Sequence, residues 1–270
     1  MLKKKISIIG CGWLGFPLAK TLVDKGYIVK GSSTSKEKLK TISDANIEAF
    51  HIVLNEDGVS GNYIDFLKGS ESVIINIPPG LRRNPNKNHV AELQHLIHAI
   101  ASSNIKNVIY ISSTSVFKDE THFPAYNSNS IPNATSNSSK QLIAIENLLK
   151  KNNNFNTTII RFGGLFDSER HPAKYLAGKT NLSNPKAPVN LIHKEDCINI
   201  ITLILKHNIW NEVFNAVHPN HPTKKDYYTS YCKKHQLDLP KFNDAEKNEG
   251  KIIESTNLEQ LLTYSFKQAL

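Results

Sequence analysis

Three glycines near the start of the chain, at positions 10, 12 and 15, have the spacing G-x-G-x-x-G. The apolar run Ile6–Ile9 before them predicts a strand, and Phe16–Leu22 after them has helical spacing. In such a turn the first glycine allows the tight bend, the second lets a pyrophosphate approach the backbone, and the third lets helix and strand pack closely. We therefore predict a dinucleotide site made by Gly10, Cys11, Gly12, Trp13, Leu14 and Gly15, the alternative being a purely structural glycine turn.

The end of the second predicted strand, residues 26–31, indicates which dinucleotide the chain prefers. An acidic residue there would hold the ribose hydroxyls of NAD. The sequence instead has hydroxyl side chains and a cation, which can bond and neutralise a 2′-phosphate: Ser32, Ser33, Thr34 and Lys36. We expect NADP(H) to be favoured over NAD(H), and the alternative is a solvated Ser/Thr loop.

Length and composition indicate a globular α/β protein. The chain has 270 residues, of which 39% are apolar and 21% charged, enough for one α/β unit with an appended lobe. No apolar run is long enough to span a bilayer, and no signal-type segment follows the lysines at positions 3–5. We expect a cytoplasmic protein without a membrane partner. The three scattered cysteines predict neither disulfides nor a metal site.

The basic residues indicate a small anionic ligand rather than a nucleic acid. The formal charge of +9 is spread over isolated lysines and short pairs, without interleaved aromatic residues. Four arginines follow predicted strands, where ligands of doubly wound sheets bind, and a guanidinium makes forked bonds to carboxylate or phosphate. We expect substrate contacts from Arg82, Arg83, Arg161 and Arg170, the alternative being structural ion pairs.

Strand-like apolar runs alternate with helical patterns up to residue 165, which is typical of repeated βα units and a parallel sheet. We predict a Rossmann-type, doubly wound domain over 1–165 and a smaller substrate lobe over 166–270, interleaved with that core as one structural unit. The predicted helix at 89–103 has an apolar stripe that excludes His95 and His98. A polar loop is expected over 118–135, and helices around 224–234 and 257–262.

Several motifs resemble the extended short-chain dehydrogenase/reductase superfamily, in its atypical YeeZ-like NAD(P)-binding branch of NAD-dependent epimerase/dehydratase-like proteins. They are the glycine turn and the segments 111–117, 160–166, 190–196 and 214–222, and together the likeness covers nearly the whole chain. The resemblance implies that Ser113 holds the position of the catalytic serine and Lys140 that of the lysine in the Tyr-x-x-x-Lys pair. Further cofactor contacts are expected from Ile77, Pro78, Pro79 and Ser112.

The chain departs from the family pattern at Ser136, which stands four residues before Lys140 where the family has its catalytic tyrosine. In the full arrangement the lysine binds the nicotinamide ribose and lowers the pKa of the tyrosine, so that the phenol exchanges a proton as hydride moves. A serine hydroxyl is shorter and far less acidic, and we expect Ser136 to cap a helix. Tyr126 and His193 are the candidate substitutes, both on the substrate side.

Two functions stay open at this point. The first is an NADP(H)-dependent oxidoreductase or epimerase/dehydratase-like enzyme for a small anionic substrate, with sugar derivatives included. In it, Ser113 polarises a carbonyl and Lys140 binds the ribose. The second is a non-catalytic NADP(H)-binding sensor or interaction protein. Either would be a monomer or a homodimer.

Overall fold

An eight-stranded sheet organises the computed structural model, which describes residues 4–270. The strand order is β11-β8-β6-β5-β1-β2-β3-β4. Its members are β1 (Lys5–Ile9), β2 (Ile28–Ser33), β3 (Glu48–Asn55), β4 (Gly58–Gly61), β5 (Ser72–Ile75), β6 (Asn107–Ser113), β8 (Asn156–Phe162) and β11 (Val213–Ala216). β1 pairs in parallel with both β2 and β5, β5 pairs in parallel with β6, and β4 is antiparallel to β3.

The chain direction across the sheet reverses between β1 and β5. From β1 it runs outward through β2 and β3, then returns to place β5 on the other side of β1. This is the switch point of a doubly wound sheet, where ligands bind beyond the carboxyl ends of the strands. The predicted Rossmann-type fold is confirmed, and the glycine turn follows the strand at this switch point.

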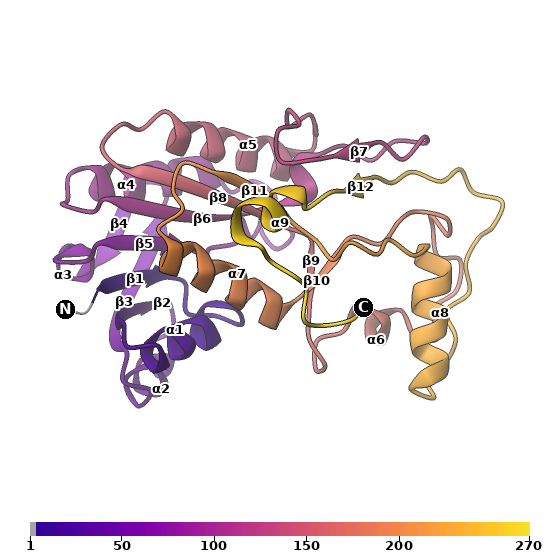
Figure 1. The fold of residues 1–270 in the computed structure, drawn as a ribbon, viewed down its shortest axis with the longest axis horizontal. Coiled ribbons are helices and arrows are strands. Elements are labelled where there is room, and N and C mark those ends of the chain that lie inside the picture. Colours follow the sequence, from indigo (N-terminus) through magenta and orange to yellow (C-terminus); the bar gives the residue numbers. More distant parts are fainter. Residues whose placement is uncertain (1–3) are drawn as a thin grey trace. The chain divides into compact units, whose positions relative to one another are not determined.

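Helices cover both faces of the sheet. α1 (Gly15–Asp24) and α2 (Glu37–Ser43) lie on one face, and α4 (His89–Ala101) and α5 (Asn137–Lys150) lie on the other (Figure 1). The remaining helices are α3 (Tyr63–Leu67), α6 (Pro172–Leu176), α7 (Lys194–His207), α8 (Lys224–Lys234), α9 (Thr256–Leu262) and a 3-10 turn, η1 (Thr114–Val116). None of the helices within residues 4–270 is long and apolar enough to cross a bilayer.

The chain divides into two compact units that alternate along the sequence. Unit 1 contains the described residues up to 112 together with 136–160 and 201–213, and unit 2 contains 113–135, 161–200 and 214–270. The sequence predicts a division at residue 165, whereas each observed unit is assembled from three separate segments.

Unit 1 has its core between the sheet and the helices. Ile8 and Ile9 of β1 are buried, as are Leu18 and Leu22 of α1, because parallel strands are covered on both faces. On α4 the stripe Leu93, Leu96, Ile97 and Ile100 is buried, while His95 and His98 are exposed as predicted.

Unit 2 contains two small sheets besides its share of the central one. β9 (Gly164–Phe166) pairs with β10 (Leu191–His193), and β7 (Ala125–Tyr126) pairs with β12 (Ile252–Ile253). The segment 118–135, expected as a loop, therefore contains a short strand whose partner is over a hundred residues away. α8 and α9 match the predicted helices.

A histidine and an aspartate hold the interior of unit 2. His171 is buried, its Nδ1 accepts the Ala173 N–H (3.2 Å), and its Nε2 lies 2.9 Å from the Tyr227 hydroxyl. Its ring stacks on Tyr231 with centroids 3.6 Å apart. Burial, helped by the nearby positive groups, lowers the pKa of His171 to about 4.

Asp196 is also buried, in the first turn of α7. Its carboxylate accepts bonds from the Tyr264 hydroxyl (2.5 Å) and from the backbone N–H groups of Lys267 (2.8 Å) and Gln268 (3.3 Å). Asp196 thus anchors the C-terminal segment to the start of α7.

Candidate functional site

The three glycines of the turn have the three different environments that the motif requires. Gly10 has φ +98°, and a Cβ there would lie 2.4 Å from the Asn76 carbonyl oxygen. A Cβ on Gly15 would lie 2.1 Å from the Gly10 carbonyl oxygen. Gly12 is exposed, and a Cβ on it would meet no atom of residues 4–270 within 4 Å. The first glycine thus allows the bend, the third allows packing, and the second faces open space.

Hydrogen bonds tie this turn to the ends of two neighbouring strands. The Gly10 N–H donates to Ser32 Oγ (3.1 Å) and the Cys11 N–H to the Ser32 carbonyl (2.8 Å). Asn76, the first residue after β5, donates from Nδ2 to the Gly10 carbonyl (3.1 Å). Sequence reasoning missed Asn76. Its position directly after a strand at the switch point could have indicated a role in the site. Ser32 is buried, and it supports the turn by accepting the two bonds from the Gly10 and Cys11 N–H groups.

The start of α1 is suited to an anion. Leu14 occupies the N-cap position, no side chain caps the helix, and its first turn has no acidic residue. The positive end of the helix dipole is therefore not neutralised by a side chain there. Trp13 is half-buried and Cys11 buried. Burial raises the pKa of the Cys11 thiol to about 12, so this residue is a neutral space-filler in the turn.

The segment after β2 contains a carboxylate as well as the predicted hydroxyls. Ser33 Oγ accepts the Ser35 N–H (3.1 Å), and the Ser35 hydroxyl donates to Glu37 Oε2 (2.5 Å). That hydrogen bond is the main cause of a lowered pKa at Glu37. Thr34 and Lys36 are exposed. Sequence reasoning passed over Glu37 because it looked for an acid at the strand end, not in the first turn of α2.

The loop between β5 and α4, residues 76–88, carries five predicted site residues. Ile77 borders the glycine turn, since its Cγ1 lies 3.4 Å from the position of a Cβ on Gly10. Pro79 is half-buried and Pro78 exposed. The side chains of Arg82 and Arg83 are exposed and make no hydrogen bond or ion pair with any residue in 4–270. Both guanidinium groups are available to an anion.

The two polar residues predicted near the cofactor have different surroundings. The Ser112 hydroxyl is buried and donates to Glu146 Oε1 (2.7 Å), so it is engaged within unit 1. Lys140 is exposed on α5, and its ammonium has no partner among residues 4–270.

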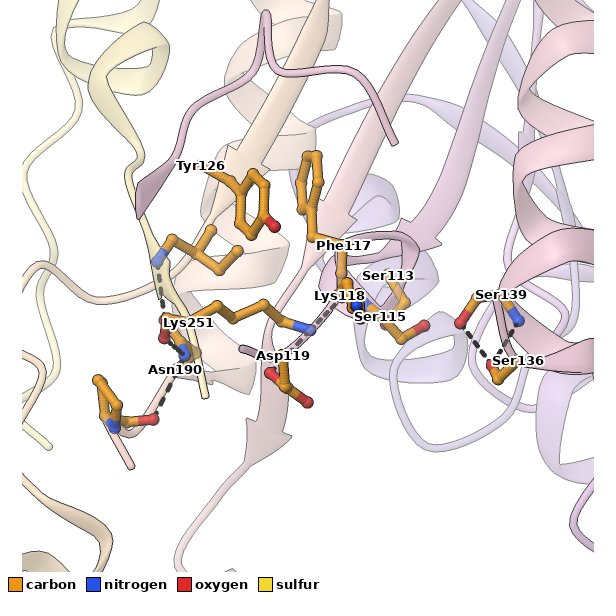
Figure 2. A network of polar contacts seen from close by, with 12 residues as sticks. Ser113, Ser115, Phe117, Lys118, Asp119, Tyr126, Ser136, Ser139, Asn190 and Lys251 are labelled. Carbon is orange, nitrogen blue, oxygen red and sulfur yellow. Dashed lines mark hydrogen bonds and ion pairs between the residues drawn. The ribbon is translucent and has the colours of Figure 1, made fainter. Parts of the chain in front are cut away.

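Ser136 is the N-cap of α5. Its Oγ accepts the Ser139 N–H (3.2 Å) and lies 2.7 Å from the Ser139 hydroxyl (Figure 2). The predicted capping role is confirmed. The hydroxyl that stands in place of the family's tyrosine is therefore occupied by local bonds.

In unit 2, Ser113 starts the short turn η1, and the residue that follows this turn, Phe117, belongs to an aromatic stack. Ser113 is half-buried, and its Oγ accepts the Ser115 N–H (3.1 Å) at the start of η1. Phe117 and Tyr126 stack face to face, with centroids 4.7 Å apart and planes 9° apart (Figure 2). The Tyr126 hydroxyl accepts a bond from Asn133 Nδ2 (3.1 Å). Its own proton remains free to be donated.

Polar bonds from distant parts of the sequence hold this stack. Lys251 donates from Nζ to the Phe117 carbonyl (2.5 Å) and pairs with Asp119 (3.3 Å), as Figure 2 shows. Asn190 donates to the Lys251 carbonyl (2.8 Å), and Asn215 donates to the Tyr126 carbonyl (3.3 Å). None of these supports could be found from local sequence patterns.

The remaining predicted substrate residues of unit 2 come from three different segments. Arg161 does not follow a strand as predicted but lies inside β8, only 1% exposed, with its guanidinium carbon 5.1 Å from the Phe117 ring centroid. Its flat cation packs on an aromatic face, which allows a charge within an apolar strand. Arg170 is exposed after β9. His193 is half-buried, and its Nδ1 accepts the Glu195 N–H (3.2 Å).

Comparison with known proteins identifies the family. Residues 10–196 match the family described as NAD(P)H-binding. The chain belongs to this family. It is also a homologue of Protein YeeZ of Escherichia coli K12, with 28% identity over 266 residues that cover 98% of this chain and 96% of YeeZ.

Solved structures confirm the fold, including the C-terminal lobe. UDP-glucuronic acid 4-epimerase from Bacillus cereus in complex with NAD superposes with a TM-score of 0.78 at 18% identity, covering 98% of this chain and 94% of that one. A short-chain dehydrogenase/reductase superfamily protein from Agrobacterium tumefaciens with bound NAD gives 0.76 at 13% identity, covering 98% and 93%. The resemblance to NAD-dependent epimerases and short-chain dehydrogenases is thus confirmed at the level of fold.

Proposed function

We propose that this NAD(P)H-binding protein is an NADP(H)-dependent oxidoreductase or epimerase/dehydratase-like enzyme for a small anionic substrate. The observation that carries the proposal is the start of α1, which lacks a side-chain cap and an acidic residue and lies beside the open space at Gly12. A diphosphate fits such a place, because the turn supplies N–H groups and the helix supplies the positive end of its dipole.

The cofactor roles fall on residues of unit 1. The turn 10–15 would hold the pyrophosphate, and Lys140, whose ammonium has no partner among residues 4–270, would bind the nicotinamide ribose. When bound, the nicotinamide supplies the hydride donor or acceptor. Ile77, Pro78 and Pro79 would flank the dinucleotide. The buried Ser112 hydroxyl, already donated to Glu146, supports the end of β6 in this proposal.

The preference for NADP(H) depends on opposing charges after β2. Lys36 and the hydroxyls of Ser33 and Thr34 favour a 2′-phosphate, since a cation neutralises it and hydroxyls donate to it. Glu37 opposes this preference, because its lowered pKa keeps it anionic. We propose that NADP(H) is bound more tightly than NAD(H), and that Glu37 limits the difference.

The catalytic roles fall on unit 2. Ser113 would donate a hydrogen bond to the substrate carbonyl, because its Oγ accepts a backbone N–H and retains its own proton. Tyr126 would supply the proton that Ser136 cannot. Its hydroxyl accepts a bond from Asn133, which holds the oxygen in place and leaves its own proton to be donated. Tyr126→Phe should therefore abolish turnover with little change in cofactor affinity, whereas His193→Gln tests the alternative acid.

The substrate would be recognised through its negative charge. Arg82 and Arg83 are exposed and have no partner in the part of the chain that the structure describes, and Arg170 is exposed as well. The structurally similar Bacillus cereus protein is a UDP-glucuronic acid 4-epimerase, so nucleotide sugars are the first substrates to screen. Buried Arg161 is assigned to holding Phe117 and the stack above it rather than to direct contact with substrate.

Thermal unfolding with NADPH, NADP, NADH and NAD tests the cofactor part. A ligand at 100 times its dissociation constant stabilises the native state by about 2.7 kcal/mol, or roughly 5 to 10 °C for a chain of this length. We expect the larger shift with the phosphorylated pair. No shift with any of the four would refute the proposal, and equal shifts would refute only the preference. Turnover is then assayed with nucleotide sugars and small carbonyl acids.

One observation favours a second candidate, a non-catalytic NADP(H)-dependent sensor. The hydroxyl at the tyrosine position is used as a helix cap. A sensor predicts that NADPH changes the oligomeric state or the binding of a partner without turnover, which light scattering with and without cofactor would detect. Turnover that disappears in Tyr126→Phe would exclude it.

A further inference from the structure

The loop at 76–88 is fastened at both ends within unit 1. At its start, Asn76 bonds the Gly10 carbonyl. At its end, Gln141 of α5 makes two bonds to the segment 87–89: its Oε1 accepts the His89 N–H (2.7 Å), and its Nε2 donates to the Lys87 carbonyl (3.0 Å). The same Nε2 also donates to Asn137 Oδ1 within α5 (3.3 Å). Asn137, one turn earlier on α5, donates to the Pro85 carbonyl (3.1 Å). The loop thus spans from the glycine turn to the first turns of α5.

A buried ionic cluster backs the far end of the loop. Glu92 of α4 is 5% exposed and lies 2.8 Å from Lys87 Nζ and 2.9 Å from His89 Nδ1. His89 is fully buried, and burial lowers its pKa despite the carboxylate. A carboxylate can only accept, so the contact between His89 and Glu92 requires the proton on Nδ1, and the ammonium of Lys87 balances the carboxylate charge. This cluster fixes the residues that Gln141 contacts.

We propose that Gln141 is a positioning residue that couples the cofactor loop 76–88 to Lys140. The inference rests on the proposed function, in which the loop and Lys140 both contact the dinucleotide. Gln141 is the next residue after Lys140 on the same helix, and it makes the direct bonds to the loop. Its amide suits this role because one end donates and the other accepts.

The first test replaces Gln141 with a side chain of similar length that makes neither bond. Gln141→Met is compared with Gln94→Met, a matched control on the exposed face of α4. Hydrogen exchange of the amides at 87–92 reports directly on the bonds made by Gln141, since the His89 N–H is a donor in one of them. We expect faster exchange there and about tenfold weaker NADPH binding in Gln141→Met only, with a melting temperature close to that of the control.

The second test separates positioning from general stability. If the bonds of Gln141 act through the position of Lys140, the losses of NADPH affinity in Gln141→Met and Lys140→Met should be non-additive. Lys140→Met already removes the ammonium that Gln141 is proposed to position. Gln141→Glu keeps the acceptor for the His89 N–H and loses the donor to Lys87, so it should be intermediate. Gln141→Glu also replaces Gln141→Met as the test variant if the methionine variant folds poorly.

The outcomes distinguish the two proposals. Wild-type protein that binds no dinucleotide refutes the proposed function and this inference with it. Wild-type protein that binds NADPH, with unchanged affinity in Gln141→Met and Gln141→Glu, overturns this inference alone. Additive losses with Lys140→Met would also overturn it, since Gln141 would then act on the loop without coupling it to the lysine.

Discussion

The substitution Gly12→Ala separates a dinucleotide site from a purely structural turn. A Cβ on Gly12 meets no atom of the described residues within 4 Å, and the residue's φ lies outside the left-handed region. The change should leave the fold intact and stabilise the ligand-free protein by up to about 1 kcal/mol, because alanine restricts the unfolded chain. The new methyl group would occupy the space in which the pyrophosphate approaches the backbone.

The expected loss of affinity can be read from thermal unfolding. If the methyl group weakens NADPH binding at least tenfold, a concentration that stabilises the wild type by about 2.7 kcal/mol stabilises Gly12→Ala by about 1.4 kcal/mol or less. The melting shift should therefore fall by half or more, while the ligand-free melting temperature stays equal or rises slightly.

Gly15→Ala is the contrasting variant. Its Cβ would lie 2.1 Å from the Gly10 carbonyl oxygen and 2.9 Å from Asn76 Nδ2, so backbone must move. We expect destabilisation of about 1 to 3 kcal/mol without ligand. A Gly12→Ala protein with wild-type NADPH affinity would refute the reasoning, because the open space at this glycine would then not be where the diphosphate binds.

Three further predictions concern charge. Glu37→Gln should raise the affinity for NADPH relative to NADH severalfold by removing an anion near the expected 2′-phosphate, and titrations with both cofactors would contradict this if the ratio is unchanged. His171, with pKa about 4 when folded and about 6.5 when unfolded, binds more protons in the unfolded state between these values. Stability should therefore be full above pH 6.5 and fall by up to about 3 kcal/mol toward pH 4, and urea unfolding of His171→Gln should show a flatter profile. Asp196→Ala leaves three donors unpaired, so we expect a loss of about 2 to 4 kcal/mol and proteolytic release of the C-terminal segment; an uncut C-terminus would contradict the anchoring role.

The parts that could be predicted from the sequence are those whose physical cause is local. The turn at 10–15 depends on glycines next to a strand and a helix, and Ser136 caps α5 through a bond three residues away. Periodicity placed His95 and His98 outside the core, because a helix repeats every 3.6 residues.

The parts that could not be predicted depend on contacts between distant segments. Arg161 resembles a residue at a strand end, but it is buried within β8, where its guanidinium lies over the ring of Phe117 from a separate segment of the chain. Asn76 and Gln141 have no motif, since their partners lie 66 residues away for Asn76 and 52 residues away for Gln141 along the chain. The short β7 strand could not be predicted either, because its partner strand is at 252–253.

The capping role of Ser136 bears on how chemistry could survive without the family's tyrosine. A serine at this position stabilises the start of α5 by about 1 kcal/mol, and α5 carries both Lys140 and Gln141. The position thus supports the ordering of the helix turn to which we assign a cofactor role, and its hydroxyl does not replace the tyrosine in proton transfer. A protein that only binds NADP(H) needs nothing more, whereas an enzyme needs a separate acid. Tyr126 has what such an acid requires, because Asn133 fixes its hydroxyl and Phe117 fixes its ring. Neither contact involves a residue of α5.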